Sequence, residues 1–174
     1  MTDAIPGLSI YAIGIGSNQP LARGLGPSAL VDAAIEALDN PPLSLLARSG
    51  IMQTAPLGPS RRRYANAAAL IETAMSPPCL LAHLQEIENR FGRRRYRRWS
   101  ARTLDLDIIL WSGGIWSNAG LSIPHIAFRQ RNFVLAPLSA IAPDWRDPVQ
   151  RLTIKHLAIR LRRRKPVDHG ANPL

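Results

Sequence analysis

Short apolar segments typical of β-strands alternate with amphipathic helical segments along this chain, without the strict β-α-β repeat of a doubly wound sheet. Short or alternating apolar runs predict strands at 8–16, 43–53, 66–73 and 104–111. Helical spacing of apolar residues predicts helices from Ser28, which is a suitable N-cap, from 76 to 91 and near 153–161. This order favours an α+β sandwich, with helices packed on a mostly antiparallel sheet.

The length and composition describe one globular domain. The chain has 174 residues, of which 46% are hydrophobic and 20% charged, and no apolar stretch is long enough to cross a bilayer. The single cysteine, Cys79, excludes a disulfide framework, and no Cys/His cluster predicts zinc. The first residues lack the basic flank of a secretory signal, so a cytoplasmic protein without membrane contact is expected.

The net charge of +10 comes almost entirely from arginine, which outnumbers lysine 20 to 2. The planar guanidinium matches phosphate oxygens better than an ammonium does. Anionic partners are therefore expected, and composition leaves phosphorylated ligands and nucleic acid both open.

Asp105 and Asp107 are the most informative residues. In a strand, residues two apart project from one face, so the two carboxylates lie together while the opposite face carries Leu104, Leu106, Ile108 and Leu110. Two adjacent carboxylates repel each other unless a cation lies between them, and magnesium is commonly held by such a pair together with substrate phosphates. The alternative is two solvated charges on an exposed edge strand.

An arginine-rich segment directly precedes this pair. Six of the ten residues at 93–102 are arginine, namely Arg93, Arg94, Arg95, Arg97, Arg98 and Arg102. Metal-binding carboxylates beside arginines suit phosphoryl transfer, which requires both charges around the phosphates. A solvated basic loop or a nucleic-acid patch remains an alternative, as does a two-metal nuclease. The chain has no P-loop, and Gly14 and Gly16 lack the third glycine of a dinucleotide fingerprint.

Eight separated motifs give the chain a specific resemblance to 6-hydroxymethyl-7,8-dihydropterin pyrophosphokinases, enzymes of folate biosynthesis. They occupy 13–18, 54–59, 64–67, 84–88, 92–93, 102–108, 123–125 and 131–138. The resemblance implies a ferredoxin-like fold and a single pyrophosphokinase domain over 1–174, with its core at about 9–160. It also implies transfer of pyrophosphate from ATP to the pterin hydroxymethyl group with release of AMP. The basic tail at 162–174 is expected to be frayed. A monomer without a nucleic-acid partner is expected.

The resemblance further assigns roles to individual residues. Asp105 and Asp107 would hold two Mg²⁺ ions, and Arg93 and Arg102 would close over the triphosphate. The ATP side would comprise Gln85, Glu88, Arg95, Arg98, Trp99, Ile108, Ser122, His125 and Arg131. The pterin pocket would comprise Thr54, Leu57, Tyr64, Asn66 and Phe133, with the two aromatic rings enclosing the heterocycle. The chain departs from the family pattern at Ala55, Ser100, Ala101 and Ile126.

Overall fold

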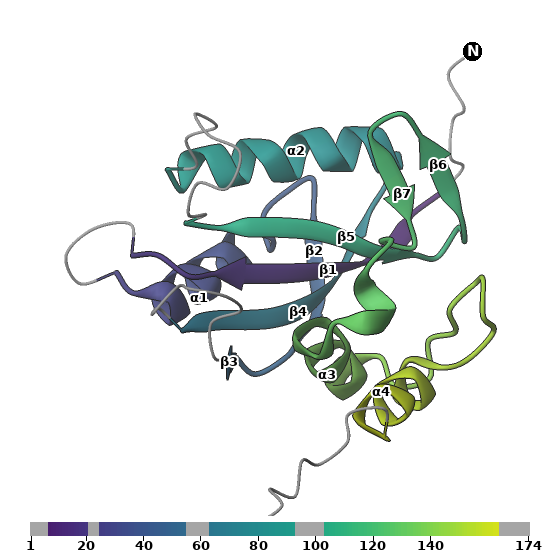
Figure 1. Cartoon of the computed structure of the whole chain (residues 1–174). Helices are drawn as coiled ribbons and strands as arrows, with labels where there is room; N and C mark the ends of the chain where they lie inside the picture. The colour runs from purple at the N-terminus through teal and green to yellow at the C-terminus, as the bar shows by residue number, and fades with distance from the viewer. Residues whose placement is uncertain (1–6, 21–24, 55–62, 93–102, 164–174) are drawn as a thin grey trace, which may run out of the picture.

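The computed structural model describes residues 7–20, 25–54, 63–92 and 103–163 (Figure 1). Its strands are β1 (Ser9–Ser17), β2 (Ser44–Arg48), β3 (Met52–Thr54), β4 (Tyr64–Thr73), β5 (Asp105–Trp111), β6 (Trp116–Asn118) and β7 (Leu121–Ile123). Its α-helices are α1 (Pro27–Ala37), α2 (Pro77–Arg90), α3 (Asn132–Ile141) and α4 (Ile154–Arg163), and a 3₁₀ turn covers Phe128–Gln130. No helix in the described segments is both long and apolar enough to span a membrane.

The main sheet has the order β2-β4-β1-β5, with β3 added to the end of β4, and its strand pairs are antiparallel. The path β1-α1-β2-β4-α2-β5 combined with this order is the ferredoxin-like arrangement. The predicted α+β class with an antiparallel sheet is therefore confirmed.

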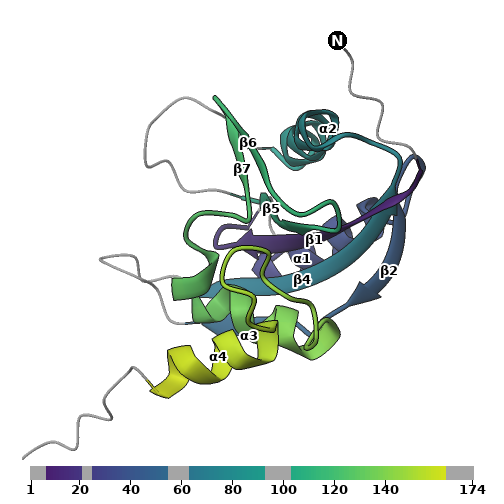
Figure 2. The ribbon, with the colours of Figure 1, turned by 90° about the vertical axis from the view of Figure 1, so that its right-hand side faces the viewer.

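Helices cover both faces of the sheet (Figure 2). One face packs against α1 and α2 in a cluster that includes Tyr11, Ile13, Ile35, Leu84 and Ile87. The other packs against α3 and α4 in a cluster that includes Ala12, Ala68, Ile109, Leu135 and Leu157. Successive residues of β1 alternate between these clusters, as a strand buried on both faces requires.

Two local predictions need correction here, and one element was not predicted. Helix α1 begins at Pro27 with Gly26 as N-cap and no side-chain cap, so the prediction of Ser28 as N-cap was wrong. Proline fits the first helical position because its missing N–H has no intrahelical partner there. The predicted strand at 43–53 is divided into β2 and β3, because Ser49 leaves the regular ladder and bonds to Ala68 through both its backbone N–H and its hydroxyl oxygen. The β6–β7 hairpin was not predicted.

Strand β5 does not keep a strict alternation. Ile13 pairs with Ile108 and Ala12 with Leu110, so Ile109 is an extra residue at a β-bulge. Leu106 and Ile108 face the α1–α2 cluster as predicted, whereas Leu110 joins Ile109 in the α3–α4 cluster. The prediction for Leu110 was therefore wrong, because the bulge turns the end of the strand over.

A buried ion pair joins the 3₁₀ turn to the segment before α4. Arg129 donates two hydrogen bonds to the fully buried Asp147 carboxylate, Nε to Oδ2 at 2.6 Å and Nη2 to Oδ1 at 2.7 Å. Burial alone would raise the pKa of Asp147, but the bonds from Arg129 and the Val149 amide outweigh burial and hold this pKa below its ordinary value. The carboxylate therefore stabilises the fold in its charged form.

Asp147→Asn is expected to lower the free energy of unfolding by about 2–3 kcal/mol at pH 7, because the substitution weakens charged hydrogen bonds in a buried site. Since the folded pKa lies below the ordinary value near 4, the contribution is complete above about pH 4 and is lost as pH falls through the lowered pKa. Urea unfolding at pH 7 and pH 3 measures both effects. Asp144→Asn, which changes an exposed carboxyl, is the control. If Asp147→Asn lowered the free energy of unfolding equally at both pH values, the charged Asp147 carboxylate would not be the stabilising form.

Candidate active site

Part of the α3 face of the sheet carries the polar residues predicted to act together. Ala12, Ala68 and Ile109 on this face are buried by α3 and α4, while their alternating neighbours toward the other end are only partly covered or polar. Gly16 lies between Asp105 on β5 and Asn66 on β4 in one row, and Gly14 lies between Asp107 and Ala68 in the next. The acidic pair and Asn66 therefore lie on one face, separated by the width of β1.

Two glycines make the surface between them flat. A Cβ at Gly16 would lie 3.5 Å from Asn66 Oδ1, and a Cβ at Gly14 would lie 3.1 Å from Ile109 Cδ1. Gly16 therefore leaves room for a ligand lying across β1, whereas the Ile109 side chain lies against Gly14. We call Gly14 and Gly16 the glycine strip. Sequence reasoning missed its role, although two glycines at strand spacing between β-branched residues were a usable signal.

Asn66 offers a directed acceptor on one side of the strip. Its side chain is 5% exposed, and Nδ2 donates a 3.0 Å hydrogen bond to Thr54 Oγ1. This bond orients the amide, so that Oδ1 lies toward Gly16. Thr54 and Asn66, both predicted in the pterin pocket, are thus brought together by the β3–β4 pairing.

Two aromatic residues flank the same face. Tyr64 is two residues before Asn66 on β4 and therefore projects from the same face, and Phe133 lies in the first turn of α3. Both side chains are half-buried. The Arg131 guanidinium carbon lies 5.8 Å from the centroid of the Phe133 ring, which places a cation beside this aromatic surface.

Asp105 and Asp107 fit a magnesium site. Both are half-buried on β5, and no group of three His, Cys, Asp or Glu side chains suited to a metal occurs in the segments that the structure describes. A hard cation held by one or two carboxylates and completed by phosphate oxygens is the usual arrangement for Mg²⁺. The Ser17 hydroxyl donates a 2.5 Å hydrogen bond to the Thr103 carbonyl, which anchors the chain two residues before Asp105.

His125 is held with one ring nitrogen available. Its backbone N–H donates to the Ile109 carbonyl at 3.0 Å, and its Nδ1 accepts the Ala127 N–H at 3.2 Å. A neutral ring with Nδ1 as acceptor carries its proton on Nε2. His125 can therefore donate one hydrogen bond from Nε2 to an anionic ligand.

The other predicted nucleotide residues differ in access. Gln85 is half-buried on α2, and Ser122 is exposed on β7. Ile108 is 3% exposed and packs in the α1–α2 cluster, so its side chain is not accessible to a ligand. Glu88 is 2% exposed, and its Oε1 accepts the Leu106 N–H at 2.8 Å. Several predicted residues lie outside the described residues, namely Leu57, Arg93, Arg95, Arg98, Trp99 and Arg102.

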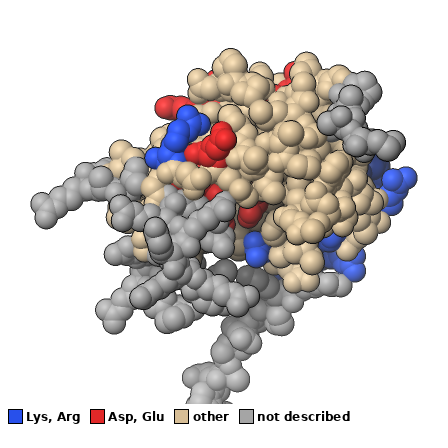
Figure 3. Space-filling view, turned by 90° about the horizontal axis from the view of Figure 1, so that it is seen from above, with Lys and Arg blue, Asp and Glu red and all other residues tan. Residues whose placement is uncertain are grey.

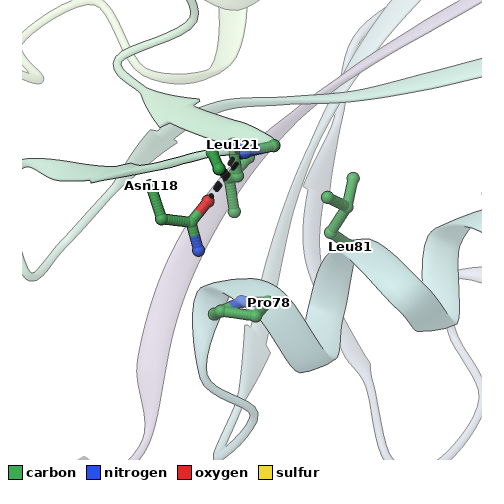
Figure 4. Close-up of a pocket in the computed structure, with 6 residues that line it drawn as sticks. Pro78, Leu81, Asn118 and Leu121 are labelled. Atoms are coloured by element: carbon green, nitrogen blue, oxygen red, sulfur yellow. Dashed lines mark hydrogen bonds between the residues drawn. The ribbon is translucent and has the colours of Figure 1, made fainter.

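The described part of the structure has two cavities to compare with this face. One of about 250 Å³ lies between the start of β4 and the start of α1, and is lined by residues that include Asn18, Pro27 and Tyr64. Another of about 370 Å³ lies between the first turns of α2 and the β6–β7 hairpin, where Pro78 and Leu81 face Asn118 and Leu121 (Figure 4). Pro78 and Glu88 are ten residues apart on α2, about 15 Å along the helix, so this larger cavity is separate from the acidic pair.

Half of the 20 arginines fall in segments outside the described residues. On the face seen from above, the described surface is mostly uncharged, with small groups of acidic and basic atoms (Figure 3). The described part of the site therefore supplies carboxylates, amides and aromatic rings, with Arg131 as a nearby cation.

Comparison with known proteins places this geometry in a family. Residues 12–143 match the family model of 7,8-dihydro-6-hydroxymethylpterin-pyrophosphokinase. The chain is 48% identical over 112 residues to the 2-amino-4-hydroxy-6-hydroxymethyldihydropteridine pyrophosphokinase of Haemophilus influenzae, covering 64% of this chain and 69% of that protein. It is 40% identical over 138 residues to the enzyme of the same name from Pseudomonas aeruginosa, covering 78% and 82% respectively.

A solved structure shows the same fold. The wild-type HPPK-DHPS of Plasmodium falciparum, crystallised with pteroate, matches with a TM-score of 0.67 at 13% identity. The match covers 88% of this chain but 42% of the P. falciparum chain, so this chain spans less than half of that protein. From the family match over residues 12–143 and the identity to curated relatives, the chain belongs to the 7,8-dihydro-6-hydroxymethylpterin-pyrophosphokinase family.

Proposed function

We propose that this chain transfers an intact pyrophosphoryl group from ATP to the hydroxymethyl group of 6-hydroxymethyl-7,8-dihydropterin. The observation that carries the proposal is the glycine strip, which separates a carboxylate pair suited to Mg²⁺ and phosphates from an amide and aromatic rings suited to a flat heterocycle. A substrate lying across β1 has its ring near Asn66 and its reacting end near Asp105 and Asp107. Positioning two substrates in this way is the main requirement of such a transfer.

The reaction is a direct displacement. The pterin hydroxyl oxygen attacks the β-phosphorus of ATP, the bond from that phosphorus to the α–β bridging oxygen breaks, and AMP leaves with that oxygen. The hydroxyl proton passes to solvent, since the two carboxylates beside the strip, Asp105 and Asp107, are assigned to the metal. Asp105 and Asp107 would hold two Mg²⁺ ions, which neutralise phosphate charge when bound.

The pterin side uses oriented polar groups between two rings. Asn66 Oδ1, directed by the bond from Nδ2 to Thr54, accepts hydrogen bonds from the amino edge of the heterocycle. Tyr64 and Phe133 cover the ring faces, and Leu57 completes the pocket. An oriented amide between two apolar surfaces matches a planar ring with a polar edge.

The nucleotide side combines residues from several elements. His125 donates from Nε2 and Arg131 contributes a guanidinium to the phosphates. Gln85, Glu88, Ile108 and Ser122 belong to the same side, with Ile108 acting through its backbone. The arginine-rich segment adds Arg93, Arg95, Arg98 and Arg102, and Trp99 adds an aromatic face for the base.

The identity of the nucleotide product tests the proposed function. The purified chain is incubated with Mg²⁺, ATP and 6-hydroxymethyl-7,8-dihydropterin, and the products are separated by anion-exchange chromatography. Pyrophosphoryl transfer gives AMP and pterin diphosphate in equal amounts. Formation of ADP, or of AMP and pyrophosphate without a pterin product, would contradict the proposal.

Phe133→Ala is expected to weaken pterin binding by about 1–3 kcal/mol, because one face of the ring loses its aromatic cover and buried area. MgATP binding should change much less, since the acidic pair and His125 are untouched and only the contact of Phe133 with Arg131 is lost. Titration calorimetry with each ligand separately measures the two affinities. Phe133→Leu, which keeps an apolar side chain, should lose a smaller part of the pterin affinity. If Phe133→Ala weakened the binding of both ligands equally, the role of Phe133 would be structural.

A further inference from the structure

Glu88 is a buried carboxylate near the C-terminal end of α2. It lies in the last turn of α2 with only 2% of its surface exposed, and its Oε1 accepts the Leu106 backbone N–H at 2.8 Å. Removing a carboxylate from water is costly unless specific hydrogen bonds stabilise it there. The bond to Leu106 is short and charge-assisted, which makes it a strong link between α2 and β5.

Leu106 is the residue between the two proposed metal ligands. β5 lies at the end of the β2-β4-β1-β5 order, so its outer side has no neighbouring strand among the described residues. Leu106 is itself 3% exposed, and a buried backbone N–H at a sheet edge requires a partner. Glu88 supplies this partner and thereby fixes the backbone that carries Asp105 and Asp107.

Glu88 approaches from the opposite side of the sheet. Leu106 packs with Leu84 and Ile87 of α2 in the α1–α2 cluster, so α2 lies on the Leu106 side of β5. Asp105 and Asp107 alternate with Leu106 and project from the other face. The described residues contain no group of three acidic or other ligating side chains suited to a metal, so Glu88 is not a third member of the acidic pair.

We infer that Glu88 is a positioning residue that sets the geometry of the Asp105–Asp107 magnesium site through the Leu106 amide. This inference rests on the proposed function. It assigns Glu88 to the nucleotide side through its support of β5, and not through direct contact of its carboxylate with ATP. Residues that orient metal ligands from behind commonly affect metal affinity by about 10–100-fold when they are replaced. The effect of Glu88 should therefore appear in the magnesium-dependent part of ATP binding.

Calorimetry of ATP binding with Mg²⁺ and with EDTA separates the two roles. Glu88→Ala should weaken MgATP binding by about 10–100-fold and leave metal-free ATP binding within about threefold of the wild type. Glu88→Gln, which keeps an acceptor oxygen, should restore most of the MgATP affinity. In the unliganded protein, hydrogen exchange of the Leu106 amide should be at least about tenfold faster in Glu88→Ala than in Glu88→Gln, because only the alanine variant leaves this amide unpaired.

Glu86→Gln is the matched control, because Glu86 lies on the exposed side of the same helix with its side chain 75% exposed. The inference fails if Glu88→Ala weakens ATP binding equally with and without Mg²⁺, which would indicate direct contact, or if MgATP binding is unchanged. Both outcomes differ from failure of the proposed function, in which the wild-type protein itself gains no ATP affinity from Mg²⁺ or forms no AMP. Thermal unfolding of each variant confirms that a folded protein was measured.

Discussion

Asp107→Ala is expected to reduce turnover by about 10³-fold or more and to remove the dependence of ATP binding on Mg²⁺. Asp107 lies beside the glycine strip with Asp105, and one remaining carboxylate is a weak anchor for magnesium. Charge stabilisation by a metal at the phosphates is worth several kcal/mol, and each 1.4 kcal/mol changes the rate tenfold. Steady-state rates and ATP calorimetry across a magnesium titration measure both losses.

Folding should be retained in this variant, because Asp107 is half-buried and projects from the face opposite the Leu106 side of β5. After chelation, the wild-type enzyme should recover with added Mg²⁺ and the Asp107→Ala variant should not. Glu36→Ala, which removes an exposed carboxylate from α1, is the control and should behave as the wild type. If Asp107→Ala retained normal magnesium activation, the assignment of this carboxylate to the metal would be wrong.

The sequence predicted the elements whose pattern is local. The β1 segment and the Leu-Asp alternation at the start of β5 correspond to strands in the structure, and α2 occupies the predicted helical range with Gly92 at φ +77° directly after its end. Each of these signals depends on neighbouring residues alone, which is why it can be read without the fold. The resemblance to a family then added the strand order, which no local pattern contains.

Features that depend on tertiary contacts could not be predicted in this way. The bulge at Ile109 is defined by its pairing with β1, and it moves Leu110 to the other face although the sequence continues to alternate. The β6–β7 hairpin has strands of three residues, too short for a periodic signal. The burial of Glu88 depends on how α2 lies over the edge of β5, so its sequence position alone does not distinguish a ligand from a support.

The site therefore has two parts, one held by the strands of the sheet and one in the arginine-rich segment at 93–102. Strands β1, β4 and β5 fix the acidic pair, the glycine strip and Asn66 in one register, because adjacent antiparallel pairs leave little freedom to shift. The cationic residues that would compensate phosphate charge lie mainly at 93–102, outside the described residues. Substitutions in the two parts should consequently differ in effect: loss of a carboxylate should lower both ground-state binding and turnover, and loss of an arginine mainly turnover.

Arg102→Ala is expected to lower kcat by about 10²–10³-fold while the affinities for MgATP and the pterin change by less than about threefold. The arginine directly precedes Thr103, whose carbonyl is held by Ser17, and we expect its guanidinium to bind the phosphates mainly as negative charge shifts in the transition state. Loss of one such donor typically costs a factor of this size in turnover. Rapid-quench single-turnover rates together with calorimetry separate the chemical step from binding.

Two further variants make the Arg102 result specific. Arg102→Lys keeps the charge but loses the planar fork, so it should recover only part of the rate. Arg90→Ala removes an exposed arginine from the last turn of α2 and should leave turnover, ligand affinities and thermal stability near the wild-type values. Near-normal turnover in Arg102→Ala would exclude this arginine from catalysis, whereas a loss confined to ATP affinity would make it a ground-state ligand.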